Sequence, residues 1–118
     1  MELKPLFFAA LMWLPASQAS ADTPQLEGHY YLTGAMEMGA ELLLRNDGTF
    51  DAGVAYGSAD GFAKGTWKVE NQTVLLESKT KPASNSDLGG LFQDLQLAIE
   101  PNCLAVDFGN GKACFRRQ

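Results

Sequence analysis

Residues 40–77 read AELLLRNDGTFDAGVAYGSADGFAKGTWKVENQTVLLE and contain three turn sequences between short runs of alternating apolar and polar residues. Such alternation indicates β-strands, because successive side chains of a strand point to opposite faces of a sheet. The three turns therefore predict four consecutive antiparallel strands, a β-meander. Each turn also predicts a register, because it fixes which residues lie opposite one another.

The first turn, RNDG at residues 45–48, has two possible registers. A two-residue Asp-Gly loop would pair Arg45 with Phe50 and place a charge on the face of an apolar ring. A type I turn followed by Gly48 in the left-handed conformation pairs Leu44 with Phe50 instead. Because a slip of one residue moves every side chain to the other face, the apolar match favours this second register.

The next two turns extend the same face. A turn centred on residues 59–60 predicts that Ala52 pairs with Trp67, and a turn centred on residues 71–72 predicts that Trp67 pairs with Leu76. Each pair joins a large apolar side chain to a small or apolar one, as the packed face of a sheet requires. The three turns together indicate one buried face.

Alternating runs continue on both sides of this meander, and a turn at residues 101–102 is expected to pair Ile99 with Leu104. The expected fold is all-β, a single antiparallel meander of about eight short strands, with no helix-length amphipathic segment. The expected strands are roughly 28–34, 40–46, 49–57, 62–70, 73–79, 92–100, 103–109 and 112–117. Consecutive antiparallel strands favour a closed barrel, which removes the sheet edges. The alternative is a two-sheet sandwich in which the irregular loop at residues 80–90 crosses between the sheets.

Residues 1–21, MELKPLFFAALMWLPASQASA, have the pattern of a secretory signal peptide. Lys4 precedes an apolar run at residues 6–14, and the small residues Ala19 and Ala21 flank the position that a signal peptidase reads. The apolar run is too short to span a bilayer. We expect a periplasmic or secreted protein whose residues 22–118 form a single domain.

The net charge of the chain is −5. An acidic chain argues against nucleic acid as a partner, because phosphate binding requires a basic face. It also argues against an anionic membrane surface as a binding partner once the signal peptide is removed.

The two cysteines bring two predictions into conflict. An exported protein is expected to join Cys103 and Cys114 in a disulfide, which stabilises a small domain. A tight turn at residues 110–111, however, pairs Cys114 with Asp107 and leaves Cys103 about 13 Å away along the strand, beyond the reach of a disulfide. Either the bridge forms across a wider final loop, or the tight register holds and the thiols stay apart.

No catalytic arrangement can be assembled from the sequence. It has one histidine, His29, without the serine or cysteine spacing that nucleophilic catalysis uses. His29 with Met36 and Met38 is a candidate soft site for copper(I), but methionines beside a turn are ordinarily gap-filling core residues. We therefore predict that the protein is not an enzyme and has no metal or cofactor.

The run DGTF at residues 47–50, followed by GTWKVENQTVLLES at residues 65–78, resembles segments of small exported bacterial β-proteins. These include lipocalin-like (calycin-type) domains and small periplasmic inhibitor barrels, in which a Gly-x-Trp segment enters a hairpin. The resemblance implies a barrel that binds without catalysis. The first strand of this chain has Gly28-His29-Tyr30 where a lipocalin has Gly-x-Trp.

Two functions are consistent with these observations. The first is the non-enzymatic binding of a small hydrophobic ligand at a barrel mouth lined by Tyr30, Tyr56 and Trp67. The alternative is a protein-interaction module, such as a periplasmic inhibitor of a secreted hydrolase, that acts through an exposed loop such as residues 80–90. The expected partner is accordingly a small apolar molecule or a secreted protein.

Overall fold

The computed structural model describes residues 25–81, 87–109 and 111–118. The expected signal peptide at residues 1–21 lies outside the described residues, as do residues 82–86 of the expected loop. Within the described part of the chain, no helix is both long and apolar enough to cross a membrane.

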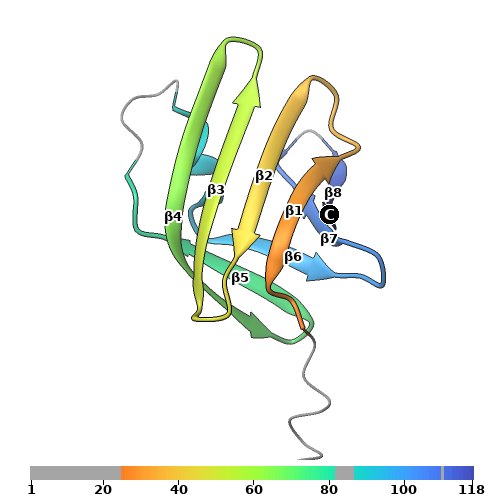
Figure 1. Cartoon of the computed structure of the whole chain (residues 1–118). Coiled ribbons are helices and arrows are strands. Elements are labelled where there is room, and N and C mark those ends of the chain that lie inside the picture. Colours follow the sequence, from red (N-terminus) through yellow and green to blue (C-terminus); the bar gives the residue numbers. More distant parts are fainter. Residues whose placement is uncertain (1–24, 82–86, 110) are drawn as a thin grey trace, which may run out of the picture.

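The described residues form a closed barrel of eight antiparallel strands (Figure 1). Each strand pairs with its neighbours in sequence, and β1 pairs with β8 to close the barrel. The strands are β1 Gly28–Thr33, β2 Met38–Leu44, β3 Thr49–Tyr56, β4 Ala59–Glu70, β5 Thr73–Ser78, β6 Leu95–Ile99, β7 Leu104–Asp107 and β8 Lys112–Arg117. The all-β prediction is confirmed, and of its two forms the structure adopts the barrel.

Several predicted registers are confirmed. Leu44 lies opposite Phe50, and Ile99 lies opposite Leu104. Gly48 has a φ of 88°, the left-handed conformation on which the first of these registers depends. Its amide donates a hydrogen bond of 3.1 Å to the Arg45 carbonyl and so closes the turn.

The register predicted between β3 and β4 is wrong by four residues. Ala52 lies opposite Ala63, not opposite Trp67. The connecting loop is Gly57-Ser58, because Gly57 adopts the positive φ of 63° that a two-residue hairpin loop uses. β4 consequently begins at Ala59. Since four is an even number, every side chain keeps its predicted face while its position along the barrel changes.

The barrel interior is filled with apolar side chains. The largest fully buried ones are Phe50, Phe92, Phe115, Leu42, Leu44, Leu76, Leu97 and Val74. No polar or charged residue is buried among the described residues. Packing of this kind supplies most of the favourable free energy of a small domain.

One of these side chains comes from a 3₁₀ helix, η2, formed by Leu88–Phe92. The predicted start of a strand at Phe92 is wrong, because β6 begins only at Leu95. In Figure 1, η2 lies behind β3 and β4, and it contacts both of these strands and β5. The Phe92 ring is fully buried and meets Phe108 edge-on, with ring centroids 6.0 Å apart. Phe92 therefore fills part of the barrel interior, and residues 88–92 are a packed 3₁₀ helix and not an exposed loop.

The close packing of η2 against β4 depends on two glycines. A Cβ atom on Gly61 would lie 2.2 Å from the amide nitrogen of Gly89. A Cβ atom on Gly89 would lie 2.2 Å from the carbonyl oxygen of Phe62. The helix thus supports the backbone of β4 directly beneath Phe62.

Candidate functional site

Tyr30, the first of the predicted ligand-binding residues, is a buried part of the barrel wall with 3% of its surface exposed. Its hydroxyl donates a hydrogen bond of 2.6 Å to the Leu26 carbonyl and accepts one of 2.7 Å from the Arg117 guanidinium. The same guanidinium carbon lies 5.3 Å from the centroid of the Tyr30 ring. These contacts tie β1, β8 and the segment before β1 together, which is a structural role.

The other two predicted residues lie at opposite ends of β3. The Trp67 indole donates a hydrogen bond of 2.8 Å to the Arg45 carbonyl, and its backbone amide donates one of 2.9 Å to Gly48. Trp67 is therefore beside the turn that precedes β3. Tyr56 ends β3 and is 44% exposed.

The expectation of one mouth lined by Tyr30, Tyr56 and Trp67 is therefore corrected. Its error follows from the register between β3 and β4. A shift of four residues moves Trp67 by about 13 Å along the barrel, from the middle of β3 to the turn before it.

The structure also separates the residues of the candidate copper site. His29 lies opposite Leu43, whereas Met38 lies opposite Tyr56 at the far end of β2. Met36 is 83% exposed. The three side chains do not converge on one point.

A different feature emerges on the outer side of β1–β4, the four strands in front in Figure 1. Two hollows of about 410 and 490 Å³ adjoin there and share Glu41, Gly53 and Phe62 in their linings. We call the combined surface the outer groove and define it by six of its residues. They are His29, Tyr31, Glu41, Gly53, Phe62 and Lys64.

The strand registers explain the shape of the outer groove. Tyr31, Glu41, Gly53 and Phe62 form one cross-strand row through β1, β2, β3 and β4. Gly53 has no side chain, and the Phe62 ring lies over it: a Cβ atom on Gly53 would be 3.6 Å from Phe62 Cε1. The other side of the Phe62 ring faces solvent, and 73% of the residue's surface is exposed.

The opposite wall of the outer groove combines an aromatic stack with a polar pair. The His29 ring stacks on Tyr31 with centroids 4.7 Å apart and an interplanar angle of 26°. His29 Nε2 lies 2.9 Å from Glu41 Oε1. The side chains of His29 and Glu41 are 45% and 59% exposed, so both remain open to a partner.

An ion pair between Arg45 and Asp51 borders the outer groove next to His29 and Lys64. The hydrogen bond from the Arg45 guanidinium lowers the pKa of the Asp51 carboxyl below its usual value, and burial opposes this effect. The same hydrogen bond raises the pKa of Arg45. Asp51 is therefore ionised at neutral pH and holds the Arg45 side chain against β3.

A separate hollow of about 450 Å³ lies beside Trp67, between β4, β5 and β6. Leu75 and Leu95 give it apolar walls, and Lys68 and Glu77 line it with charge. It shares no lining residue with the outer groove.

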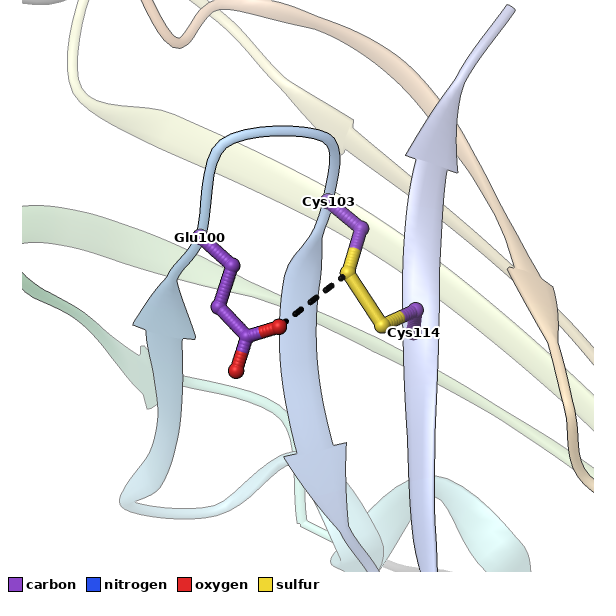
Figure 2. A group of neighbouring side chains, drawn as sticks. All are labelled: Glu100, Cys103 and Cys114. Atoms are coloured by element: carbon purple, nitrogen blue, oxygen red, sulfur yellow. Dashed lines mark hydrogen bonds between the residues drawn. A yellow bond between two sulfur atoms is a disulfide. The ribbon is translucent and has the colours of Figure 1, made fainter.

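The two cysteines are joined in a disulfide with a Cα–Cα distance of 5.6 Å (Figure 2). The register predicted between β7 and β8 is wrong by two residues, because Cys114 lies opposite Ala105 and not opposite Asp107. Of the two alternatives left open by the sequence, the structure has the wider final loop together with the bridge.

The wider loop between β7 and β8 is stabilised by Asp107. Its carboxylate accepts hydrogen bonds of 2.7 Å from the Gly109 amide and 3.4 Å from the Gly111 amide. Both glycines have positive φ, 105° and 113°. The expected turn pair at residues 110–111 includes Asn110, which lies outside the described residues.

Glu100 lies beside the disulfide, as Figure 2 shows. Its Oε1 atom is 3.9 Å from Cys103 Sγ, and its Oε2 atom is 2.8 Å from Lys112 Nζ. The ligand atoms of Glu100, Cys103 and Cys114 all lie within 4.8 Å of one another. In the disulfide state the two sulfurs are bonded to each other and are not thiolates.

Sequence reasoning missed Phe62 and Gly53 as site residues, although their outward face follows from the predicted alternation. The outward position of an aromatic residue, Phe62, was the available signal, whereas its place opposite Gly53 follows only from the observed register.

Comparisons with known proteins support the fold. No protein-family model matches the sequence, and no curated protein matches it. A search of solved structures finds a similarity to the Cpx pathway activator NlpE from Escherichia coli, with a TM-score of 0.51 and 13% sequence identity. The match covers 70% of this chain and 41% of the NlpE chain, so this chain spans less than half the length of that protein. At this identity the similarity concerns the fold alone.

Proposed function

We propose that this protein is an exported, non-enzymatic interaction module that binds a partner protein through the outer groove. The observation that carries the proposal is Phe62, a large aromatic side chain that lies over Gly53 in the lining of the outer groove and is 73% exposed. Exposed apolar surface of this kind commonly marks an interaction site. Aromatic residues are also enriched among the residues that dominate binding energy at interfaces.

The support beneath Phe62 favours a binding role over a chance exposure. Its carbonyl oxygen lies against Gly89 so closely that a Cβ atom there would be 2.2 Å away. The strand backbone is thereby braced by η2, and a braced anchor loses less entropy on binding. The other wall offers the stacked His29 and Tyr31 rings and the carboxylate of Glu41.

The chemistry of the outer groove describes the partner. An apolar side chain of the partner would rest against the exposed side of the Phe62 ring, and a cationic or amide donor would face Glu41. The acidic chain, with its net charge of −5, favours a partner surface of positive potential. A secreted hydrolase, the class implied by the resemblance to periplasmic inhibitor barrels, is the first partner class to test.

The proposal is tested by placing a photo-crosslinking amino acid at position 62 of the full chain. The matched control carries it at position 69, because Val69 is an exposed apolar residue of the same strand, 41% accessible, outside the outer groove. After irradiation in the producing cell, we expect one exported protein to be captured at position 62 and not at position 69.

The captured protein is then purified and titrated against wild type and F62A. A loss of affinity of about tenfold or more in F62A is expected, the effect of removing an interface residue worth at least 1.4 kcal/mol. Equal capture at both positions, or unchanged affinity in F62A, would contradict the proposal.

The hollow beside Trp67 favours a second candidate function, the binding of a small apolar molecule. Its volume of about 450 Å³ is within the range of ligand pockets, and Trp67, Leu75 and Leu95 supply apolar walls. Saturable quenching of Trp67 fluorescence in the mature chain by an apolar ligand such as a fatty acid, abolished in L75E, would support this candidate. Absence of quenching would remove it.

A further inference from the structure

The cluster of Glu100, Cys103 and Cys114 has no part in the outer groove and carries a separate inference. We propose that, when the disulfide is reduced, these three residues form a binding site for one zinc ion. The site is alternative to the disulfide, so the same two sulfur atoms either bond to each other or bind the metal.

The distance from the carboxylate to Cys103 suits a tetrahedral ion, and the two sulfurs would separate from their bond to about 3.8 Å on binding it. Bonds of about 2.3 Å to sulfur and about 2.1 Å to oxygen place a thiolate and a carboxylate oxygen about 3.6 Å apart. In the structure Glu100 Oε1 is 3.9 Å from Cys103 Sγ, and all the ligand atoms lie within 4.8 Å of one another. The Cα atoms of the two cysteines are 5.6 Å apart, close enough for both sulfurs to bind a single ion.

The backbone orients these ligands before any metal arrives. The Glu100 amide donates a hydrogen bond of 2.9 Å to the Cys103 carbonyl across the turn from β6 to β7. This bond keeps the two side chains on the same side of the turn, as Figure 2 shows. Cys114 approaches from β8, where its place opposite Ala105 is fixed by the strand register.

Lys112 completes the charge balance. Two thiolates and a carboxylate carry three negative charges, and a zinc ion carries two positive ones. The ammonium of Lys112, 2.8 Å from Glu100 Oε2, neutralises the remaining charge. It also holds the carboxylate so that Oε1 faces the sulfurs, the arrangement in which an outer partner orients a metal ligand.

A hollow on the outer face reaches the Glu100 side of the site, although neither cysteine lines it. This hollow of about 410 Å³ includes Glu100 and Lys112 in its lining, with Ala98 and Ala105 among the small residues beside them. Three protein ligands leave the fourth tetrahedral position of zinc to a water molecule, which this hollow can admit.

A dithiol reductant transfers two electrons and two protons to the disulfide, breaks the sulfur–sulfur bond and is itself oxidised to a disulfide. The two protein thiols then bind the zinc ion and release two protons to water. Since bound thiolates are held by the metal, zinc and reoxidation of the bridge compete.

The test uses the mature chain in oxidised form and after reduction with a phosphine, which does not bind zinc as a dithiol does. The phosphine takes an oxygen atom from water and becomes a phosphine oxide while the disulfide becomes two thiols. Zinc chloride is added, and native mass spectrometry counts bound ions. We expect one zinc per reduced chain, none per oxidised chain, and none in C103S.

Glu100 is tested with E100Q, for which we expect zinc affinity to fall about tenfold or more. The control is E77Q, since Glu77 is an exposed carboxylate paired with Lys79 in a different hollow, and its affinity is expected to match wild type. Cobalt(II) as a substitute ion should give a thiolate charge-transfer band in wild type and a shifted band in E100Q.

If reduction of the disulfide partly unfolds the barrel, circular dichroism provides a second measurement of zinc binding. Zinc is then expected to restore the β-sheet spectrum in wild type and E77Q but not in E100Q. The inference is overturned if reduced chains bind no zinc, if E100Q binds it as tightly as wild type, or if the metal is held only by a chain that stays unfolded. None of these outcomes bears on the outer groove.

Discussion

Replacing Phe92 by alanine tests whether η2 fills the barrel. The Phe92 side chain is fully buried and belongs to the same core cluster as Leu97 and Phe115. A buried Phe→Ala substitution costs about 3–5 kcal/mol, because transfer free energy is lost and a cavity remains. For a domain whose total stability is of the order of 5–15 kcal/mol, such a loss leaves the fold marginal.

The assay is urea unfolding followed by far-ultraviolet circular dichroism, with the disulfide intact in every variant. At a slope of about 2 kcal/mol per molar urea, a loss of 4 kcal/mol lowers the midpoint by about 2 M. F62A is the matched control, the same chemical change at a side chain that is 73% exposed. Its unfolding free energy is expected to stay within about 0.5 kcal/mol of wild type.

The two substitutions should therefore have opposite effects in the stability and the binding measurements. F92A should lose stability, while F62A should lose partner binding and keep stability. If F92A loses less than about 1 kcal/mol, a value typical of an average substitution, the interior is not closed by η2. An unfilled interior would then favour the binding of a small ligand over the binding of a protein partner.

Three further predictions concern the glycine contact, the ion pair and the bridge. G61A is expected to lose about 1–3 kcal/mol in urea unfolding, because its Cβ would lie 2.2 Å from the Gly89 nitrogen; G39A, with nothing within 4 Å of the added carbon, should be near neutral. The lowered pKa of Asp51 means that its contribution to stability is complete above the ordinary carboxyl pKa and is lost as pH falls through the lower folded value. In D51N the free energy of unfolding should decrease less steeply as the pH falls. If the decrease is as steep as in wild type, groups other than Asp51 cause the sensitivity to acid. Removing the bridge in a C103A/C114A double variant should cost about 2–4 kcal/mol, and mass spectrometry of the unreduced mature chain should find no free thiol.

The faces of the strands could be predicted from the sequence, whereas positions along the barrel could not. Alternation assigns each side chain to a face, so Phe50 and Leu76 were correctly expected inside. Register depends on the conformation of a few loop residues. Gly57 adopts positive φ, and this single choice displaced the pairing of β3 and β4 by four residues without moving any side chain to the other face.

The 3₁₀ helix η2 could not be predicted from alternating apolar and polar residues, for a different reason. Leu95, Leu97 and Ile99 alternate as the inward side chains of a strand, and the apolar Phe92 three residues earlier suggested that the same strand began there. The local signal was Asp87, whose carboxylate accepts a hydrogen bond of 2.9 Å from the Gly89 amide at the start of the helix. Short 3₁₀ turns depend on such caps more than on periodicity.

Only part of each candidate site could be predicted from the sequence. Bonding of Cys103 and Cys114 was favoured by their number and the expected export, but their contact required the loop that Asp107 stabilises. The outer groove depends on Gly53 lying in the same cross-strand row as Phe62. That row exists only in the observed register, since the predicted register placed the two residues four positions apart.

The strand β4 contributes both to the packed interior of the barrel and to the outer groove. On its inner side, β4 presents Gly61 to η2, whose Phe92 occupies the space that a ligand would need. On its outer side, the next residue along is Phe62, exposed over Gly53. The 3₁₀ helix therefore fills part of the interior and, through the same contact, supports the strand that carries the exposed Phe62. For a barrel built in this way, we therefore propose that binding takes place on the outer surface.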